Sequence, residues 1–279
     1  PVRVQGGTPR GREWRVDAGV SSQFVSALLL LAAAQDDGPI EVVVAGELAS
    51  RPYVEMTLGM MRRCGIVCED AGQRFLVHPA EPMSAVIAVE PDASAASYFL
   101  VAAAITGTRV RIRGLGAGSA QGDVGLANAL ERMGCGLAMS EDAIELEGRP
   151  LRGIEIDMET MPDVVLSLAI AAARAEGPTR ITHVGNLRVK ESDRLHAAAT
   201  ELERVGVRTE EGPDFLVIHP STALRPAQIH TYDDHRVAMA FGLLQLITPG
   251  IELEDPSCVA KSFPTFWDEL ARLQQHLRV

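Results

Sequence analysis

Long apolar runs and membrane-targeting signals are absent from this chain of 279 residues. Its longest apolar stretch runs from Phe24 to Ala34 and is interrupted by Ser26, whereas a membrane-spanning helix needs about 20 apolar residues. The first residues lack the charged and then apolar layout of a signal peptide. The sequence therefore predicts neither a transmembrane segment nor secretion.

Positive charge is also scarce. The 26 basic residues are outnumbered by 37 acidic ones, which gives a formal net charge of −11. Nucleic acids and anionic membranes attract positively charged surfaces, so we expect no nucleic-acid and no membrane partner. With 47% apolar and 23% charged residues, the chain can bury a core, and its length suits one large or two modest domains.

Cysteine is rare, and the four cysteines form neither a CxxC pair nor a dense disulfide framework. Cys64 and Cys68 are four residues apart, but Gly65 between them is typical of a helix end, which disfavours a metal pair. We interpret both as small buried residues of a protein in the reducing cytoplasm.

An internal repeat is the strongest pattern present. Four apolar, alanine-rich segments begin at Ser21, Asp92, Asp163 and Asp234, and the intervals from 21 to 92, 92 to 163 and 163 to 234 are each 71 residues. After each segment come a β-type stretch and a polar turn, and in three units a second helical pattern ends in glycine. Each unit therefore predicts roughly a β-α-β-α-β-β order, with the apolar helices buried and the sheets outside.

Polar residues recur where these helices begin. The four starts carry Ser-Ser-Gln, Asp, Asp and Asp-His-Arg, and Lys190 and Lys261 occupy equivalent turns 71 residues apart. Helix N-termini carry partial positive charge and free N–H groups, so several that point to one place make an anion site. We therefore expect an anionic substrate at the common end of these helices.

Simpler interpretations exist for the single motifs. KESDR alone is also typical of a capped helix start with Ser192 or Asp193 as the cap, and Asp163 could likewise be a helix cap. Arg236 is different, because a guanidinium beside a buried alanine-rich helix is costly unless it meets an anion.

Seven strings, in this order, carry a family resemblance: SSQFVSALLL, SRPYVEM, EPDASAASYFL, SAQGD, NLRVKESDR, DDHRVAMA and VAKSFPTFW. Together they resemble the 5-enolpyruvylshikimate-3-phosphate synthase family over essentially the whole chain. The resemblance implies an α/β (α+β) enolpyruvyl transferase-like fold of two domains built from βαβαββ units. It assigns residues 1–88 to a partial first domain with one full unit and 89–279 to a second domain with three.

The resemblance also implies the activity. Members of the family transfer the enolpyruvyl group of phosphoenolpyruvate to the 5-hydroxyl of shikimate 3-phosphate and release phosphate, in the shikimate pathway of aromatic amino acid biosynthesis. They need no metal or organic cofactor, and we expect a cytoplasmic monomer. Roughly the first third of a family chain has no counterpart here, so we expect these 279 residues to be poorly active without it.

Site residues follow from the matching motifs. By resemblance, shikimate 3-phosphate would be held by Ser21, Ser22, Gln23, Ser50, Asn186 and Lys190, with Tyr53 close by. Phosphoenolpyruvate would be bound by Arg194, Arg236 and Lys261, with Gln23 between the two substrates. Asp163 would accept the hydroxyl proton, and Glu191 would deliver a proton to carbon. Whether the nearby cations or burial decide the pKa of Glu191 stays open at this point.

Two other functions stay open. One is a related enolpyruvyl transferase that acts on UDP-N-acetylglucosamine, although KESDR and DHRVAM favour the shikimate enzyme. The other is a catalytically inactive fragment that binds shikimate 3-phosphate. A turnover measurement separates that fragment from an enzyme.

Overall fold

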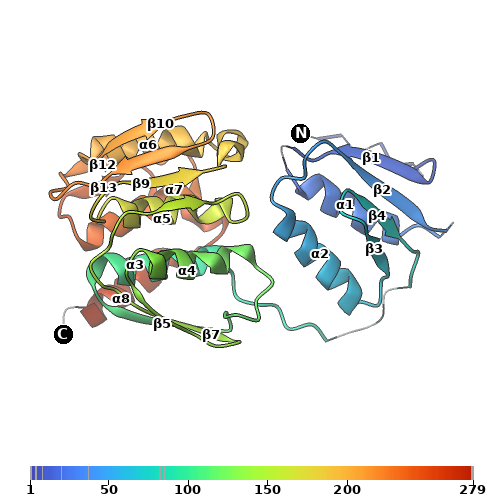
Figure 1. The fold of residues 1–279 in the computed structure, drawn as a ribbon, viewed down its shortest axis with the longest axis horizontal. Coiled ribbons are helices and arrows are strands. Elements are labelled where there is room, and N and C mark those ends of the chain that lie inside the picture. Colours follow the sequence, from blue (N-terminus) through green and yellow to red (C-terminus); the bar gives the residue numbers. More distant parts are fainter. Residues whose placement is uncertain are drawn as a thin grey trace. The chain divides into compact units, whose positions relative to one another are not determined.

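The computed structural model describes residues 2–3, 5–7, 9–19, 21–36, 38–81, 83 and 86–277. The chain divides into two compact units, residues 1–88 and 89–279 (Figure 1). Within the described part of the chain, no helix has both the length and the apolar character that crossing a membrane requires.

The first unit is one complete βαβαββ repeat. Its elements are, in chain order, β1 (Glu13–Asp17), α1 (Gln23–Ala33), β2 (Ile40–Ala45), α2 (Arg51–Arg63), β3 (Cys68–Asp70) and β4 (Arg74–Val77). The strands form one sheet in the order β1-β2-β4-β3, in which β1 and β2 are parallel and the other pairs are antiparallel. Helix α1 packs on this sheet and buries Val25 and Leu29 against Val42 and Phe75.

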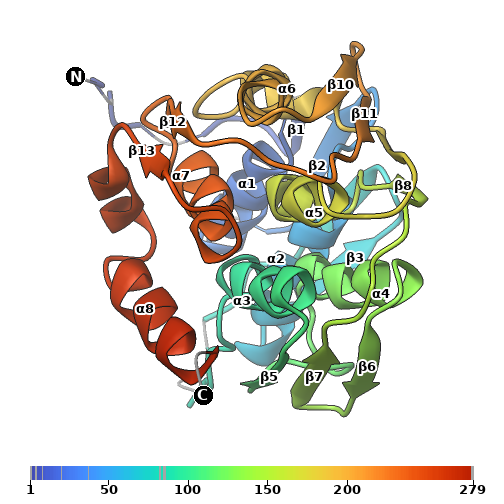
Figure 2. The same cartoon turned by 90° about the vertical axis from the view of Figure 1, so that its left-hand side faces the viewer.

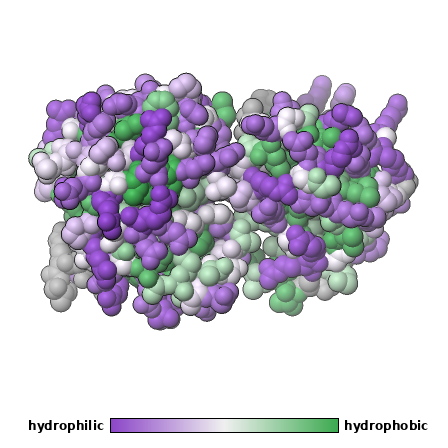
Figure 3. Space-filling view, viewed as in Figure 1, coloured by the Kyte–Doolittle hydropathy of each residue, from purple (hydrophilic) through white to green (hydrophobic). Residues whose placement is uncertain are grey.

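Part of helix α1 faces away from that core. Figure 3 shows small apolar patches among mostly hydrophilic side chains on the visible face of the molecule. In α1, Phe24 is 52% exposed and Leu30 54% exposed, although both belong to the apolar run of the sequence. The sheet therefore covers only one side of this helix, and its opposite side stays apolar and open.

The second unit continues the repeat with three inner helices. Its elements are α3 (Ala93–Thr106), β5 (Arg109–Arg113), η1 (Gly122–Val124), α4 (Gly125–Arg132), β6 (Gly136–Met139), β7 (Ala143–Glu147), β8 (Glu155–Asp157), η2 (Pro162–Val164), α5 (Val165–Ala172), β9 (Thr179–Thr182), η3 (Gly185–Val189), α6 (Arg194–Arg204), β10 (Arg208–Glu211), β11 (Leu216–His219), β12 (Ala227–Ile229), α7 (His235–Gly242), η4 (Leu243–Leu246), β13 (Ile251–Leu253), η5 (Pro256–Lys261) and α8 (Phe266–Leu277).

Sheets surround the inner helices α3, α5 and α7. The strand orders are β5-β7-β6, β10-β11-β9-β8 and β12-β13. Figure 2 looks nearly along the three helices and shows these sheets on different sides of them. Helix α5 contacts both α3 and α7 and has all eight residues buried, as a helix that is apolar on every side requires. The expected arrangement of buried helices and outer sheets is confirmed.

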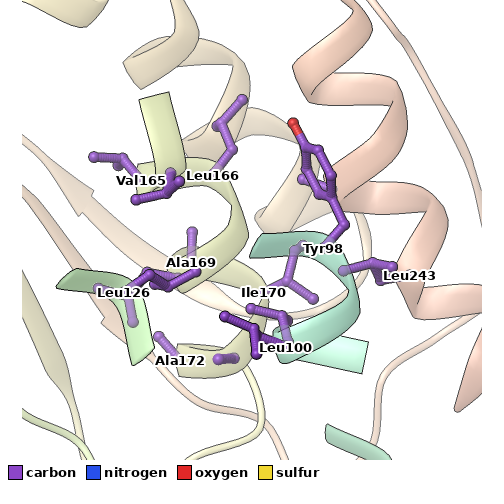
Figure 4. Close-up of a cluster of buried hydrophobic side chains, with 14 of the residues drawn as sticks. Tyr98, Leu100, Leu126, Val165, Leu166, Ala169, Ile170, Ala172 and Leu243 are labelled. Atoms are coloured by element: carbon purple, nitrogen blue, oxygen red, sulfur yellow. The ribbon is translucent and has the colours of Figure 1, made fainter. Parts of the chain in front are cut away.

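The core of this unit lies where the inner helices meet. Figure 4 shows Leu100, Leu126 and Ile170 packed together, with Leu243 beside them. All four are at most 2% exposed, and burying each such side chain contributes about 1.5–3 kcal/mol to the folded state. Tyr98 borders the same cluster, and its hydroxyl points away from it in Figure 4. This packed core therefore holds the inner helices, and with them their polar ends, in fixed positions.

The repeats are not equally complete. The repeat from β8 to β11 shows the full βαβαββ order, whereas the described residues between β4 and α3 contain no strand that would open the repeat of α3. In the last repeat, η5 and α8 follow β13, where the other repeats have a second helix and a pair of strands. Pro256 and Pro264 lie in this stretch, and proline is disfavoured inside helices and strands, which accounts for the departure from the pattern.

All four cysteines are free thiols. The expectation that Cys64 and Cys68 are buried is wrong, because both are half-buried and only Cys135 lies in the core. Cys68 begins β3, which is an edge strand and so has a neighbour on one side only. Partial burial and the nearby Asp70 raise the pKa of the Cys68 thiol to about 11.

Candidate active site

Charged side chains of the second unit converge where its inner helices begin. They come from η2, from the segment between η3 and α6, from the first residue of α6, from the start of α7 and from the end of η5. They are Asp163, Glu191, Arg194, Asp234, Arg236 and Lys261. The 71-residue repeat explains this convergence, because equivalent helices begin at the same end of the unit. We call these six residues the charged network.

Arg194 is the centre of the charged network. It is the first residue of α6, and its side chain is only 2% exposed. Its guanidinium donates to Asp234 Oδ2 at 2.8 Å, to Glu191 Oε2 at 2.5 Å and to Asp163 Oδ1 at 3.3 Å. Three carboxylates thus compensate one buried cation, which is the arrangement that a buried guanidinium requires.

Arg236 extends the network on the side of α3. Its Nη2 donates to Asp163 Oδ2 at 3.0 Å. Burial lowers the pKa of Arg236. The negative charges around it, including those of Asp163 and Asp123, raise this pKa by more than burial lowers it, so it lies above its ordinary value. Tyr98 lies on the same side, and burial raises its pKa to about 12 against the opposing effect of Arg236. Arg236 is therefore a permanent cation at the start of α7.

Glu191 joins Arg194 to Lys261. The Lys261 ammonium donates to Glu191 Oε1 at 2.8 Å, and both side chains are partly exposed. Burial raises the pKa of Glu191, but the hydrogen bond from Lys261 and the charge of Arg194 outweigh it and lower the pKa to about 2. In the free site the cations therefore outweigh burial, and Glu191 is an ionised carboxylate.

Asp234 is a member of the network that the sequence pattern did not single out as a site residue. Its side chain is fully buried, and it accepts hydrogen bonds from Arg194, from Ser192 Oγ at 2.9 Å and from the backbone N–H of Arg236 at 2.9 Å. Burial raises its pKa, but these bonds and the charge of Arg194 lower it on balance. The 71-residue interval between Asp163 and Asp234 is the signal that could have identified it.

A constrained turn places Asp234. Tyr232 and Asp233 both have left-handed backbone angles, with φ of 56° and 52°, which is unusual for residues other than glycine. The fully buried Glu201 of α6 holds this turn, because it accepts from Tyr232 Oη at 2.9 Å and from the backbone N–H of His230 at 3.2 Å. The turn then delivers Asp234 as the cap of α7.

The three residues that the sequence suggests as possible helix caps, Ser192, Asp193 and Asp163, make different contacts in the structure. Asp193 caps α6 by accepting from the N–H of His196 at 2.9 Å, whereas Ser192 bonds Asp234 instead. Asp163 lies in η2, the turn before α5, where it contacts both arginines. A carboxylate that only capped α5 would not be turned toward two guanidinium groups.

Two further predicted residues lie next to the network. Asn186 belongs to η3, and Lys190 follows that turn directly before Glu191. The Lys190 side chain makes no ion pair with any residue that the structure describes, and it is half-buried. It is therefore a cation without a carboxylate partner beside a network whose other cations are paired.

The remaining predicted residues form a separate group in the first unit. Ser21, Ser22 and Gln23 lead into α1, where the backbone N–H of Gln23 donates to Ser21 Oγ at 3.3 Å. Ser50 and Tyr53 occupy the start of α2, and Ser50 has a left-handed backbone with φ of 52°. Ser22 and Ser50 are buried, whereas Gln23 is exposed.

The two helix starts of the first unit lie side by side. The N–H of Ala49 donates to the carbonyl of Ala18 at 3.2 Å, which joins the segments that precede α1 and α2. One to two turns into the helices, Ser26 Oγ and Thr57 Oγ1 are 2.8 Å apart. Serine hydroxyls and two helix N-termini thus gather at one end of this unit, as a phosphate site requires.

Metal ligands do not gather in the described residues: no group of three or more histidine, cysteine, aspartate or glutamate side chains there could hold a metal ion.

The arrangement of repeats and helices defines the class of the protein. Its fold matches that of the enolpyruvyl transferase NikO from Streptomyces tendae, with a TM-score of 0.71 at 24% identity over 90% of this chain and 59% of that one. It also matches EPSP synthase from Acinetobacter baumannii, with a TM-score of 0.79 at 28% identity over 94% of this chain and 62% of that one. The fold is that of the enolpyruvyl transferases.

Sequence comparison narrows the class to a family. The family model of EPSP synthase (3-phosphoshikimate 1-carboxyvinyltransferase) matches residues 1–270, and the chain belongs to this family. It is 45% identical over 273 residues to the 3-phosphoshikimate 1-carboxyvinyltransferase of Aeromonas salmonicida (strain A449). That alignment covers 95% of this chain and 62% of the relative, so the chain spans less than two thirds of the relative's length.

Proposed function

We propose that the protein transfers the enolpyruvyl group of phosphoenolpyruvate to the 5-hydroxyl of shikimate 3-phosphate and releases phosphate. The observation that carries this proposal is the charged network, in which three cations and three carboxylates lie together at helix starts in a chain of the EPSP synthase family. Two anionic substrates need such cations, and an addition followed by an elimination needs a base and an acid.

Phosphoenolpyruvate would bind to Arg194, Arg236 and Lys261, with Gln23 between the two substrates. Planar guanidinium groups match carboxylate and phosphate oxygens with paired hydrogen bonds. In the free protein these cations are held by Asp163, Glu191 and Asp234, which keeps them in place before the ligand arrives. Catalysis gains from such preorganised charge, because no reorganisation is needed at the moment of reaction.

Shikimate 3-phosphate would bind to Ser21, Ser22, Gln23, Ser50, Asn186 and Lys190, with Tyr53 close by. Hydroxyls and helix N–H groups suit a phosphate, and the starts of α1 and α2 offer both. Lys190 adds a cation that no described carboxylate neutralises. The substrate thereby gains both hydrogen bonds and charge compensation.

Asp163 would act as the base. It takes the proton of the 5-hydroxyl while the oxygen forms a bond to C2 of phosphoenolpyruvate. Arg194 and Arg236 each hold one of its carboxylate oxygens, at 3.3 and 3.0 Å, which fixes its orientation. A base must be held within hydrogen-bond reach of the proton that it removes, and these two contacts supply that restraint.

Glu191 would deliver a proton to C3 of phosphoenolpyruvate. Its depressed pKa in the free site opposes this role, because Lys261 and Arg194 stabilise its ionised form. When the substrate's phosphate and carboxylate engage those two cations, Glu191 loses the contacts that lower its pKa, so it can take up a proton. The tetrahedral intermediate then loses phosphate by cleavage of the bond between C2 and the phosphate oxygen, and C3 returns a proton to the Glu191 carboxylate, which restores the double bond.

The experiment that tests this function measures phosphate release from phosphoenolpyruvate and shikimate 3-phosphate by these 279 residues with the missing third of a family chain supplied in trans. The expected result is release that requires both substrates and that falls about 10²–10⁴-fold in Asp163→Asn, the contribution typical of a general base. Asp193→Asn is the matched control, because asparagine also caps a helix and this residue is outside the charged network. Release with UDP-N-acetylglucosamine as the acceptor instead, or binding of shikimate 3-phosphate without turnover, contradicts the proposal.

We place the protein in the cytoplasm as a monomer that needs no cofactor and binds no nucleic acid. Four free thiols suit a reducing compartment, and a net charge of −11 disfavours polyanionic partners. Light scattering at several protein concentrations tests the monomer, because mass that rises with concentration would contradict it.

A further inference from the structure

A buried carboxyl group lies outside the charged network and has no role in the proposed chemistry. Asp123 belongs to η1, the turn that leads into α4, and is 6% exposed. Its Oδ2 accepts a hydrogen bond from Ser94 Oγ of α3, whereas its Oδ1 is buried and has no hydrogen-bond partner among the residues that the structure describes. A buried carboxylate oxygen without a partner is costly, which indicates a role that the free protein does not display.

The groups around Asp123 come from three elements. Helix α3 contributes Ser94 and its cap Asp92, η2 contributes Asp163, and α7 contributes Arg236. Turns η1 and η2 are in contact, so Asp123 and Asp163 belong to neighbouring segments. Burial raises the pKa of Asp123 to about 6, the charges of Asp163 and Asp92 add to the rise, and Ser94 and Arg236 oppose it. The negative charges of Asp163 and Asp123 thus both act on the Arg236 guanidinium.

We propose that Asp123 is a proton-binding residue behind the anion site, and that it takes up a proton when an anion binds to Arg236. This inference depends on the proposed function only for the identity of the natural anion, phosphoenolpyruvate. Asp123 does not touch the reacting atoms; it is a positioning residue that adjusts the charge beside Arg236.

Charge balance explains the coupling. Asp163 already pairs with Arg236 at 3.0 Å, and Asp123 adds a second negative charge nearby. A phosphate or carboxylate that binds to the same guanidinium brings further negative charge to a poorly hydrated place. A like charge favours the neutral form of a carboxyl group, so the bound anion raises the proton affinity of Asp123. Protonation removes the excess charge at the oxygen that has no partner.

Because anion binding takes up a proton, the affinity for the anion falls as the pH rises. Near pH 7.5 the Asp123 carboxyl of the free protein is mostly ionised, and in the complex it is mostly protonated, so binding consumes close to one proton. The affinity for the anion then falls about tenfold per pH unit between the pKa of the free form and that of the bound form. Asp123→Asn imitates the protonated carboxyl, so it binds the anion more tightly at pH 8 and loses this dependence.

Titration calorimetry of the intact protein tests the proposal, with phosphoenolpyruvate and sulfate as the two ligands. Measurements in buffers of different ionisation enthalpy count the protons taken up, and sulfate has no proton of its own to exchange in this pH range. The expected result is uptake with both ligands, its loss in Asp123→Asn, and an affinity at pH 8 that rises by up to about a hundredfold in that variant, which is about tenfold for each pH unit above 6. A variant that is merely misfolded cannot gain affinity.

Two further variants complete the test. Ser94→Ala removes a hydrogen bond that lowers the pKa of Asp123, so its affinity profile should shift to higher pH. Asp255→Asn is the control, because Asp255 is an exposed cap of η5 and is not among the charges that shift the pKa of Asp123, so its proton uptake should match the unaltered protein. Uptake that persists in Asp123→Asn overturns the inference. Sulfate binding with Asp123-dependent uptake, but no binding of phosphoenolpyruvate, would support the inference and contradict the proposed function.

Discussion

Arg194 and Asp234 form a two-pronged ion pair in the interior of the second unit. Arg194 Nε lies 2.8 Å from Asp234 Oδ2, and Nη2 lies 3.2 Å from Oδ1. The aspartate side chain is completely buried and that of the arginine is 2% exposed. The pair joins the first residue of α6 to the cap of α7, so it fixes two helix starts relative to each other.

Breaking this pair should destabilise the protein strongly. In Asp234→Asn, Arg194 loses a buried carboxylate, and Ser192 and the start of α7 lose a charged acceptor. Removal of one partner of a buried pair costs about 3–5 kcal/mol, because the other charge is left uncompensated. Urea unfolding measures the change in the free energy of unfolding. Asp255→Asn is the control. It alters an exposed cap of η5 and should lower the free energy of unfolding by less than about 1 kcal/mol. Equal losses of stability in the two variants would contradict this interpretation.

The pKa of Glu191 should depend on Lys261. Lys261→Met removes the hydrogen bond that contributes most to lowering that pKa, while it keeps most of the unbranched side chain. The pKa of Glu191 should therefore rise from about 2 toward its ordinary value, although Arg194 continues to lower it. Carbon NMR titration of labelled glutamate carboxyl groups measures this shift. An unchanged titration midpoint would show that Lys261 does not stabilise the ionised form.

Much of this architecture could be predicted from the sequence, because apolar, alanine-rich segments with polar residues at their starts recur every 71 residues. Alanine-rich segments such as the one that begins at Asp163 have no polar face, so they had to be inner helices. Polar residues at equivalent positions of such repeats had to gather at one end. The repeat singled out Lys261 as the counterpart of Lys190, and the family resemblance assigned Arg194 and Arg236 to the site. The structure brings these three cations into one network with Asp163 and Glu191.

Other features depend on tertiary contacts that periodicity does not encode. Asp234 resembles an ordinary cap in the sequence, and only the distance to Arg194 identifies it as the buried counter-ion. The direction of the Glu191 pKa shift depended on two competing effects whose sizes are set by geometry. Asp123 lies in a turn of the SAQGD string, and its burial follows from how η1 packs against α3.

Asp123→Asn should stabilise the protein at high pH. A carboxyl whose pKa is raised in the folded state contributes stability that is fully present below its ordinary pKa of 3.8 and is lost as the pH rises through about 6. Asparagine does not ionise, so at pH 8 the variant should gain about 1–3 kcal/mol relative to the unaltered protein. Urea unfolding at pH 8 and at pH 5 should show the gain shrinking at the lower pH, and a gain that is equal at both would contradict ionisation as its cause.

The turn that positions Asp234 should depend on the buried Glu201. Tyr232→Phe removes one donor and leaves Glu201 with Arg204 and the N–H of His230, so it should cost about 1 kcal/mol. Glu201→Gln removes the charge from three donors at once and should cost about 2–3 kcal/mol. Because both act on one hydrogen-bonded group, the double variant should cost less than the sum of the two single ones. A strictly additive double-mutant cycle in urea unfolding would show that Tyr232 and Glu201 do not stabilise the turn together.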